Sequence, residues 1–221
     1  MSRKHYSLWH EARSTPSLAL LVRELRRALK GCNSVLDVGC GSRSPLRLVR
    51  ASHTTGIDGY QPALDEARSG GTHDDFAFGD VKDIGKVFVD RRFDACIALD
   101  VIEHLTKEDG WKMLETMERL ATKRVVIFTP NGFIPQKSHD GDLQEHLSGW
   151  LADEMRQRGY CVRGMYGLKS LRGEYHHIKR SPKAFWLMVA ILSHYLYTHH
   201  RPEKSSAIFC VKELDKDKQS A

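Results

Sequence analysis

Acidic and imidazole side chains gather in one short stretch, D-V-I-E-H, near the middle of the chain. Asp100, Glu103 and His104 stand at positions i, i+3 and i+4, which places all three on one face of a helical turn. Carboxylates and imidazoles in this arrangement can hold a divalent ion, and a histidine alone can accept a proton near neutral pH. The same residues can instead cap a helix and bond to neighbouring backbone groups, so both interpretations stay open.

A second chemical feature is the turn V-L-D-V-G-C-G-S over residues 35–42. We interpret this stretch as a buried strand, a tight turn and a helix that begins near Pro45. Gly39 and Gly41 lack the Cβ that would keep a ligand away from the backbone, and a helix start offers unpaired N–H groups. The turn is suited to a nucleotide-like ligand, but it lacks the spacing of phosphate-loop and dinucleotide motifs.

The elements that must position these residues alternate between strands and helices. Apolar runs predict strands near residues 35–38, 54–58, 76–81, 92–100, 124–129, 160–165 and 206–213. Amphipathic patterns predict helices over residues 16–30, 61–68 and 111–120, and a further helix opened by residues 145–150 and closed by Gly159. This order predicts an open α/β sheet with ligands at the carboxyl ends of its strands.

The glycine turn resembles the first motif of the class I S-adenosylmethionine-dependent methyltransferases, V-L-D-V-G-C-G-x-G, with Arg43 where the family usually has a small residue. The resemblance covers residues 15–165 and the last strand, and the whole pattern is most similar to uncharacterised prokaryotic type-11-like members. It implies a Rossmann-like open sheet of about seven strands. The sheet would be mostly parallel with an antiparallel last strand, with helices on both faces and a helical insertion before the last strand.

The resemblance also implies that S-adenosylmethionine is the cofactor and assigns its contacts. Asp58 ends the second strand, where a carboxylate can accept hydrogen bonds from ribose hydroxyls. Asp80 would meet the adenine amino group, and the backbone of Val81 would meet the ring. The other cofactor-binding residues that we expect are Asp37, Gly39, Gly41 and Asp100.

Methyl transfer from a sulfonium is an in-line displacement, so the protein aligns the acceptor, excludes water and helps to remove a hydroxyl proton. We expect Glu103, His104 and His146 to be the catalytic residues. D-x-x-E-H with a later histidine resembles the E-x-x-E-H of plant-type small-RNA 2′-O-methyltransferases, and in part that of ubiquinone-pathway O-methyltransferases. That likeness would make Asp100, Glu103, His104 and His146 or His139 ligands of a divalent metal, a secondary expectation. A metal-free alternative keeps His104 or His146 as the general base.

The length of 221 residues and the 41% hydrophobic content predict one domain. We expect a methyltransferase domain over residues 1–214, with a helical substrate-side insertion over 168–205 and a charged tail over 215–221. Within the insertion, residues 184–197 are apolar on nearly every side but fall short of the roughly 20 residues of a spanning helix. We expect a buried helix there, with an interfacial membrane or dimer contact as the alternative.

The net charge of +6 and the pI near 9.1 favour an anionic partner, although solvated helix faces also explain cations that are spread along the chain. The five cysteines are scattered and form no C-x-x-C pair, which indicates buried thiols in a reducing compartment. The N-terminal residues lead into no apolar core, so we expect no signal peptide and a cytoplasmic location.

Together these observations predict an S-adenosylmethionine-dependent methyltransferase that O-methylates a small molecule or a cell-envelope glycan or lipid intermediate. The first alternative is a divalent-metal-dependent RNA 2′-O-methyltransferase, and the second is a non-catalytic cofactor-binding or scaffold protein. Nucleic acid and a peripheral membrane contact therefore stay open as partners. The oligomeric state is not predicted.

Overall fold

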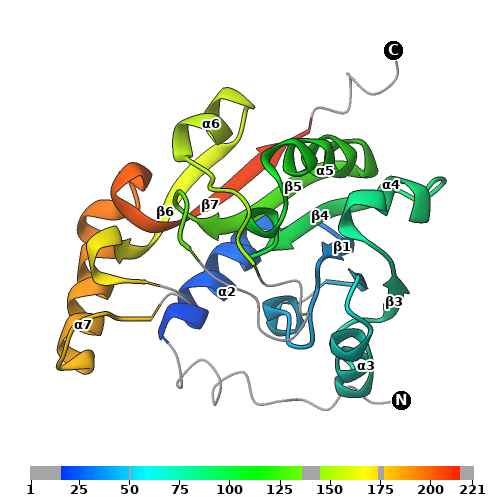
Figure 1. The fold of residues 1–221 in the computed structure, drawn as a ribbon. Helices are drawn as coiled ribbons and strands as arrows, with labels where there is room; N and C mark the ends of the chain where they lie inside the picture. The colour runs from blue at the N-terminus through cyan, green and yellow to red at the C-terminus, as the bar shows by residue number, and fades with distance from the viewer. Residues whose placement is uncertain (1–15, 50, 136–144, 174–176, 215–221) are drawn as a thin grey trace.

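The apolar runs of the chain assemble into one seven-stranded sheet in the order β3-β2-β1-β4-β5-β7-β6 (Figure 1). The computed structural model describes residues 16–49, 51–135, 145–173 and 177–214. The strands are β1 (Ser34–Val38), β2 (His53–Asp58), β3 (Asp75–Phe78), β4 (Phe93–Leu99), β5 (Ala121–Pro130), β6 (Cys161–Leu168) and β7 (Ser205–Glu213). Strands β1 to β5 pair in parallel, whereas β7 is antiparallel to both of its neighbours. The predicted Rossmann-like sheet with an antiparallel last strand is confirmed.

Strand β4 shows why the central strands are almost continuously apolar. Ala95 and Ile97 pack into the core on one face of the sheet, and Cys96 and Ala98 pack into the core on the other face. A strand that is covered on both faces has no polar side to alternate with. The sheet therefore separates two hydrophobic cores.

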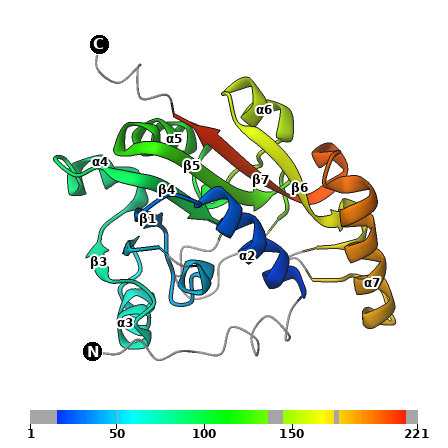
Figure 2. The same cartoon turned by 180° about the vertical axis from the view of Figure 1, so that it is seen from behind.

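The expectation of helices on both faces is confirmed (Figures 1 and 2). One core contains residues of α2 (Pro16–Ala28) and the short 3₁₀ helix η1 (Pro45–Leu48), and the other contains residues of α4 (Ile84–Val87), α5 (Lys107–Leu120) and α6 (Ala152–Gln157). Helix α3 (Gln61–Gly70) follows β2. The remaining elements are η2 (Val81–Asp83), η3 (Ile102–His104), η4 (Lys169–Leu171), α7 (Lys183–Ser193), the π-helix η6 (His194–Thr198) and η7 (Pro202–Lys204).

The short helix that we expected after the glycine turn begins at Pro45, and it is the four-residue 3₁₀ helix η1. Its buried residues Leu46 and Leu48 are two positions apart, which is not the spacing of one face of an α-helix. Ser44 caps this turn by accepting a hydrogen bond from the Leu46 N–H at 3.1 Å. Val49 then returns to extended backbone.

The expected helix start at residues 145–150 is wrong, because α6 begins only at Ala152. The preceding residues run extended beside the end of β5, where Trp150 forms an isolated parallel bridge with Asn131. A Cβ at Gly149 would lie 2.3 Å from the Phe133 backbone nitrogen, so the two chain segments meet at a glycine. This close approach keeps residues 145–150 extended against the end of β5, so they do not form a helix.

The helix of the insertion differs from the buried helix that we expected. Ala190 is the one buried residue of α7, although nearly all of the helix is apolar. Among the described residues, no helix combines the length and apolar character needed to cross a membrane.

Candidate active site

The site residues meet at one edge of the sheet because parallel strands end at the same edge. Strands β2 and β4 both pair with β1, on opposite sides, so the strand order reverses there. Such a reversal opens a crevice at the carboxyl ends of the strands, where open α/β sheets bind ligands. The loops that follow β1 to β5 supply the predicted cofactor and catalytic residues.

The glycine turn after β1 has the backbone conformation that its composition predicts. Gly39 and Gly41 have φ values of +68° and +53°, which residues with a Cβ rarely adopt. A Cβ at Gly39 would lie 2.6 Å from a methyl carbon of Val101, whereas a Cβ at Gly41 would point into open space. Gly39 therefore allows close packing, and Gly41 keeps the backbone exposed at the sheet edge.

Asp37 stabilises the glycine turn through its side chain. Its carboxylate is buried, accepts a hydrogen bond from the Ser44 hydroxyl, and lies 3.0 Å from Nε2 of His73. Nδ1 of the same imidazole lies 2.9 Å from the Thr72 hydroxyl. These contacts show Asp37 positioning the turn, while its predicted contact with the cofactor stays a prediction.

Asp58 joins the turn to the end of β2. One carboxylate oxygen accepts a hydrogen bond from the Gly41 N–H at 2.8 Å, and the other accepts from the Tyr60 N–H at 2.8 Å. The carboxylate is thus held beside the open face of the glycine turn. Asp80 and Val81 follow the next strand, and the Asp80 carboxylate caps η2.

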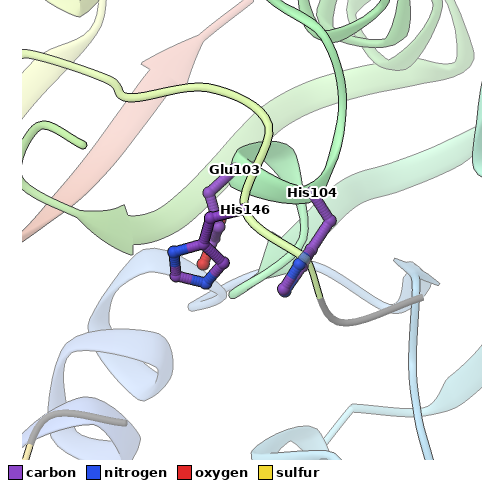
Figure 3. A group of neighbouring side chains, drawn as sticks. All are labelled: Glu103, His104 and His146. Atoms are coloured by element: carbon purple, nitrogen blue, oxygen red, sulfur yellow. The ribbon is translucent and has the colours of Figure 1, made fainter. Parts of the chain in front are cut away.

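The structure brings Glu103, His104 and His146 together (Figure 3). One possible ligand atom from each side chain lies within 4.8 Å of those of the other two. Glu103 and His104 come from η3, after β4, and His146 comes from the extended segment after β5. The predicted association of these three residues is therefore present, although they are distant in sequence.

Backbone carbonyls orient both imidazoles. Nδ1 of His104 lies 3.0 Å from the carbonyl oxygen of Glu145, and Nδ1 of His146 lies 2.7 Å from that of Ile134. A carbonyl oxygen only accepts hydrogen bonds, so each Nδ1 carries a proton, and in a neutral imidazole the lone pair is then on Nε2. A backbone carbonyl at the second nitrogen is the usual way in which proteins orient metal-binding histidines.

Glu103 is a buried carboxylate. Its Oε2 accepts a hydrogen bond from the Thr129 hydroxyl at 2.8 Å, and its side chain is shielded from solvent. Burial, together with the negative charge of Asp100, raises the pKa of Glu103 well above its usual value. A buried carboxylate requires a compensating charge or a proton, and a dication held with the two imidazoles would provide that charge.

This donor set fits a divalent ion. One carboxylate and two imidazoles suit first-row transition metals. Bonds of about 2.1 Å place opposite ligands no more than about 4.2 Å apart, so small side-chain rotations would suffice to close the set.

Asp100 lies beside this group but is not a member of it. It follows β4 with φ of +54°, and its N–H donates to the Phe128 carbonyl at 2.8 Å. The expected single helical turn that carries all three residues is therefore wrong, since η3 starts only at Ile102. Helix α5 does not use these residues as its cap, because Thr106 accepts a hydrogen bond from its Asp109 N–H. His139 lies outside the described residues.

Three residues that position the site were not predicted from the sequence. Thr129 bonds to Glu103, His73 contacts Asp37, and the Trp150 indole N–H donates to the Ile102 carbonyl at 3.2 Å. Each of them contacts its partner through tertiary structure, so no spacing in the sequence indicates the pairing. The T-P-N-G stretch at the end of β5 was the one local signal near Thr129.

Comparisons with known proteins show which family and which fold the chain is similar to. Residues 36–129 match the family model described as a methyltransferase domain. The probable tRNA methyltransferase 9B of Bos taurus is 27% identical over 130 residues, which are 58% of this chain and 28% of that protein. The chain therefore spans less than a third of the length of this relative.

Two solved structures share the fold at low sequence identity. The methyltransferase domain of bacterial CtHen1-C has 18% identity and a TM-score of 0.54, with 89% of this chain and 96% of that chain covered. The magnesium protoporphyrin IX methyltransferase ChlM of Synechocystis PCC 6803, solved with bound S-adenosylmethionine, has 16% identity and a TM-score of 0.51, with 96% and 86% covered. Residues 36–129 are therefore similar to a methyltransferase domain, and the chain shares the fold of these two methyltransferases.

Proposed function

We propose that this protein transfers the methyl group of S-adenosylmethionine to a hydroxyl oxygen, with a divalent ion held by Glu103, His104 and His146. The proposed acceptor is a small molecule or a cell-envelope glycan or lipid intermediate. The observation that carries the proposal is the meeting of one buried carboxylate and two oriented imidazoles at the carboxyl edge of the sheet. A bound divalent ion polarises a hydroxyl and lowers its pKa.

The chain's own residues have separate roles in this proposal. Gly39, Gly41 and Asp58 bind the cofactor, and Asp80 with Val81 contacts its adenine. When bound, S-adenosylmethionine supplies an electrophilic methyl group, and the carbon–sulfur bond electrons leave with sulfur as the new carbon–oxygen bond forms. The hydroxyl proton leaves to solvent or to a nearby base. In the metal-free alternative that base is Nε2 of His104 or His146.

An RNA 2′-hydroxyl is the second candidate acceptor. The sequence similarity to a probable tRNA methyltransferase and the net charge of +6 support it. A role as a non-catalytic scaffold is less well supported, because the glycine turn and Asp58 form the geometry expected for cofactor binding.

We also propose that residues 1–214 act as one domain, with residues 168–205 on the substrate side, and that the protein is cytoplasmic. After residues 168–205, β7 returns into the same sheet between β5 and β6, which supports one domain. The five free cysteines support a reducing compartment, although Cys161 is exposed and not buried as we expected. The expected charged tail over 215–221 lies outside the described residues.

The acceptor is tested by incubating the purified protein with isotopically labelled S-adenosylmethionine and a cell extract, with and without a chelator. The extract is then separated into RNA, lipid–glycan and small-molecule fractions. We expect chelator-sensitive label in the lipid–glycan or small-molecule fraction. Nuclease-sensitive label would make RNA the acceptor. Label that survives the chelator would reject the metal and favour a histidine base.

The ligand set is tested with Glu103→Gln, His104→Ala and His146→Ala. We expect turnover to fall by roughly 10²-fold or more in each variant, because general acid–base and metal effects are of this size. Binding of S-adenosylhomocysteine, measured by calorimetry, should stay nearly unchanged. Mn²⁺ binding, followed by electron paramagnetic resonance, should weaken in all three variants. The matched control is His53→Ala, which removes an exposed histidine at the start of β2.

Equal losses of turnover and cofactor affinity in these variants would indicate a structural role for the three residues. Unchanged Mn²⁺ binding, with turnover lost, would reject the metal and leave the histidines as bases. The first outcome would reject the three residues as a catalytic site, and the second would reject only the metal ion.

A further inference from the structure

The insertion presents an apolar helix face to solvent. Phe185, Met188 and Leu192 of α7 and Leu196 of η6, which we call the outer face, are 48%, 52%, 51% and 81% exposed. Their spacings of three and four residues align them on one side of a continuous helix. Contiguous exposed apolar side chains of this kind mark an interaction site.

The opposite side of the same helix is docked on β6. A Cβ at Gly167 would lie 2.1 Å from the Ala190 carbonyl oxygen, and a Cβ at Gly164 would lie 2.0 Å from the Thr198 carbonyl oxygen. The two glycines therefore let the helix backbone rest directly on the strand, and Ala190 and Thr198 are buried there. At about 100° per residue, the outer face lies on the far side from this contact. The outer face therefore cannot pack against the chain's own sheet.

The charged side chains of the segment that carries the outer face, residues 175–202, all have one sign. Residues 175–202 contain no aspartate or glutamate, but they include Lys179, Arg180, Lys183 and Arg201. Within the described part of the chain, no carboxylate forms an ion pair with any of these four cations. The cations precede and follow the apolar residues in sequence, so they flank the outer face at both of its ends.

Aromatic side chains accompany the cations at both ends. The Arg180 guanidinium lies 4.9 Å from the centre of the Trp186 ring, and that of Arg201 lies 5.3 Å from the Tyr197 ring. Tryptophan and tyrosine favour the boundary between lipid headgroups and acyl chains, because their rings are apolar with one polar atom. Arginine can keep its charge at headgroup level while its stem contacts the apolar layer.

We propose that the outer face binds the surface of a lipid bilayer that contains anionic lipids. The helix would lie in the interface plane, with its apolar side chains in the headgroup–acyl boundary and its flanking cations on the lipid phosphates. A second copy of the chain fits less well. Pairing two such faces in either direction would place cations against cations, with no carboxylate in the segment to separate them.

The test is co-sedimentation of the full chain with vesicles of phosphatidylcholine alone and of phosphatidylcholine mixed with phosphatidylglycerol. We expect binding to the mixed vesicles, weakened when NaCl rises from about 0.05 M to about 0.5 M because salt screens the cations. The double variant Met188→Glu/Leu192→Glu should lose this binding. The triple variant Lys179→Gln/Arg180→Gln/Lys183→Gln should bind the mixed vesicles about tenfold or more weakly.

The matched control is Val89→Glu, which places a carboxylate on an exposed valine of another surface and should bind like the unaltered chain. Thermal unfolding confirms that each variant is folded before it is compared. Unchanged vesicle binding by the folded Met188→Glu/Leu192→Glu variant would overturn the proposal. A second result would also overturn it. In that case the unaltered chain binds neither kind of vesicle and is a dimer by light scattering, whereas the Met188→Glu/Leu192→Glu variant is a monomer.

Discussion

His194 is a buried histidine whose surroundings oppose its protonation. The residue is fully shielded from solvent, and neither ring nitrogen has a hydrogen-bond partner among the described residues. Burial is the main cause that lowers its pKa to about 4, and His199, Arg23 and Arg172 add to it. Glu24 acts in the opposite direction, but it is outweighed.

We predict that this single residue makes stability depend on pH. Between its ordinary pKa of 6.5 and the folded value of about 4, the unfolded chain binds a proton at His194 that the folded chain does not. The free energy of unfolding should therefore fall as the pH drops through this window, by up to roughly 3 kcal/mol. Urea unfolding at pH 7.5 and pH 4.5 measures the loss, which His194→Leu should largely remove.

The control is His200→Gln at an exposed histidine of the same segment, which should keep the full pH dependence. A smaller slope should persist in His194→Leu, because burial also lowers the pKa of His199. An unaltered pH dependence in His194→Leu would contradict the assignment.

At the scale of elements, α5 and the extended segment before α6 are fitted to each other. Gly110 of α5 faces Trp150, and a Cβ on this glycine would lie 2.4 Å from the indole. The same segment is bonded to η3, because the Leu147 and Ser148 N–H groups both donate to the Glu103 carbonyl. The position of His146 thus depends on a contact made through Trp150.

We predict that Gly110→Ala is destabilising, although the same change in an ordinary helix stabilises by about 1 kcal/mol. Trp150 is fully buried, so the added methyl group must displace it, and overpacking costs about 1–3 kcal/mol. Urea unfolding should show a net loss of stability, and turnover should fall as His146 shifts. Gly70→Ala is the matched control at the end of α3, where the nearest atom to a Cβ is 3.8 Å away. A Gly110→Ala protein at least as stable as the unaltered chain would refute this packing argument.

For the molecule as a whole, the proposed cofactor site is assembled from loops after several strands, so it can form only in the folded chain. A ligand that binds the folded state alone stabilises it by about 2.7 kcal/mol at a concentration of 100 Kd. For a chain of this size we predict that S-adenosylhomocysteine raises Tm by roughly 5–10 °C. Differential scanning calorimetry measures the shift.

Asp58→Ala should reduce this shift and weaken S-adenosylhomocysteine binding by about 1–3 kcal/mol, because it removes the carboxylate that faces the glycine turn. Asp65→Ala on the exposed surface of α3 is the control and should leave both values unchanged. Full affinity in Asp58→Ala would reject its role as the ribose ligand. The absence of any shift in the unaltered chain would reject the cofactor site.

Local sequence patterns were enough to predict the sheet and the edge at which the proposed site residues lie. Apolar runs, the glycines of the turn and the order of strands are local properties, and they correctly predicted an open α/β sheet, whereas the antiparallel direction of β7 was predicted from the family resemblance. Because most of the predicted cofactor residues lie at or just after the end of a strand, predicting the strands was enough to gather Gly41 and Asp58 at one place.

Which side chains meet and which stay exposed depends on the tertiary structure. His146 reaches Glu103 only because residues 145–150 run extended, held by a bridge to Asn131 and by Trp150 against Gly110. The apolar composition of α7 did not reveal whether the helix is buried, because burial depends on what packs on each side. Its β6 contact covers only one side, so Leu192 and its neighbours face outward. Contacts between segments that are distant in the chain leave no local pattern, and for that reason only the folded structure shows them.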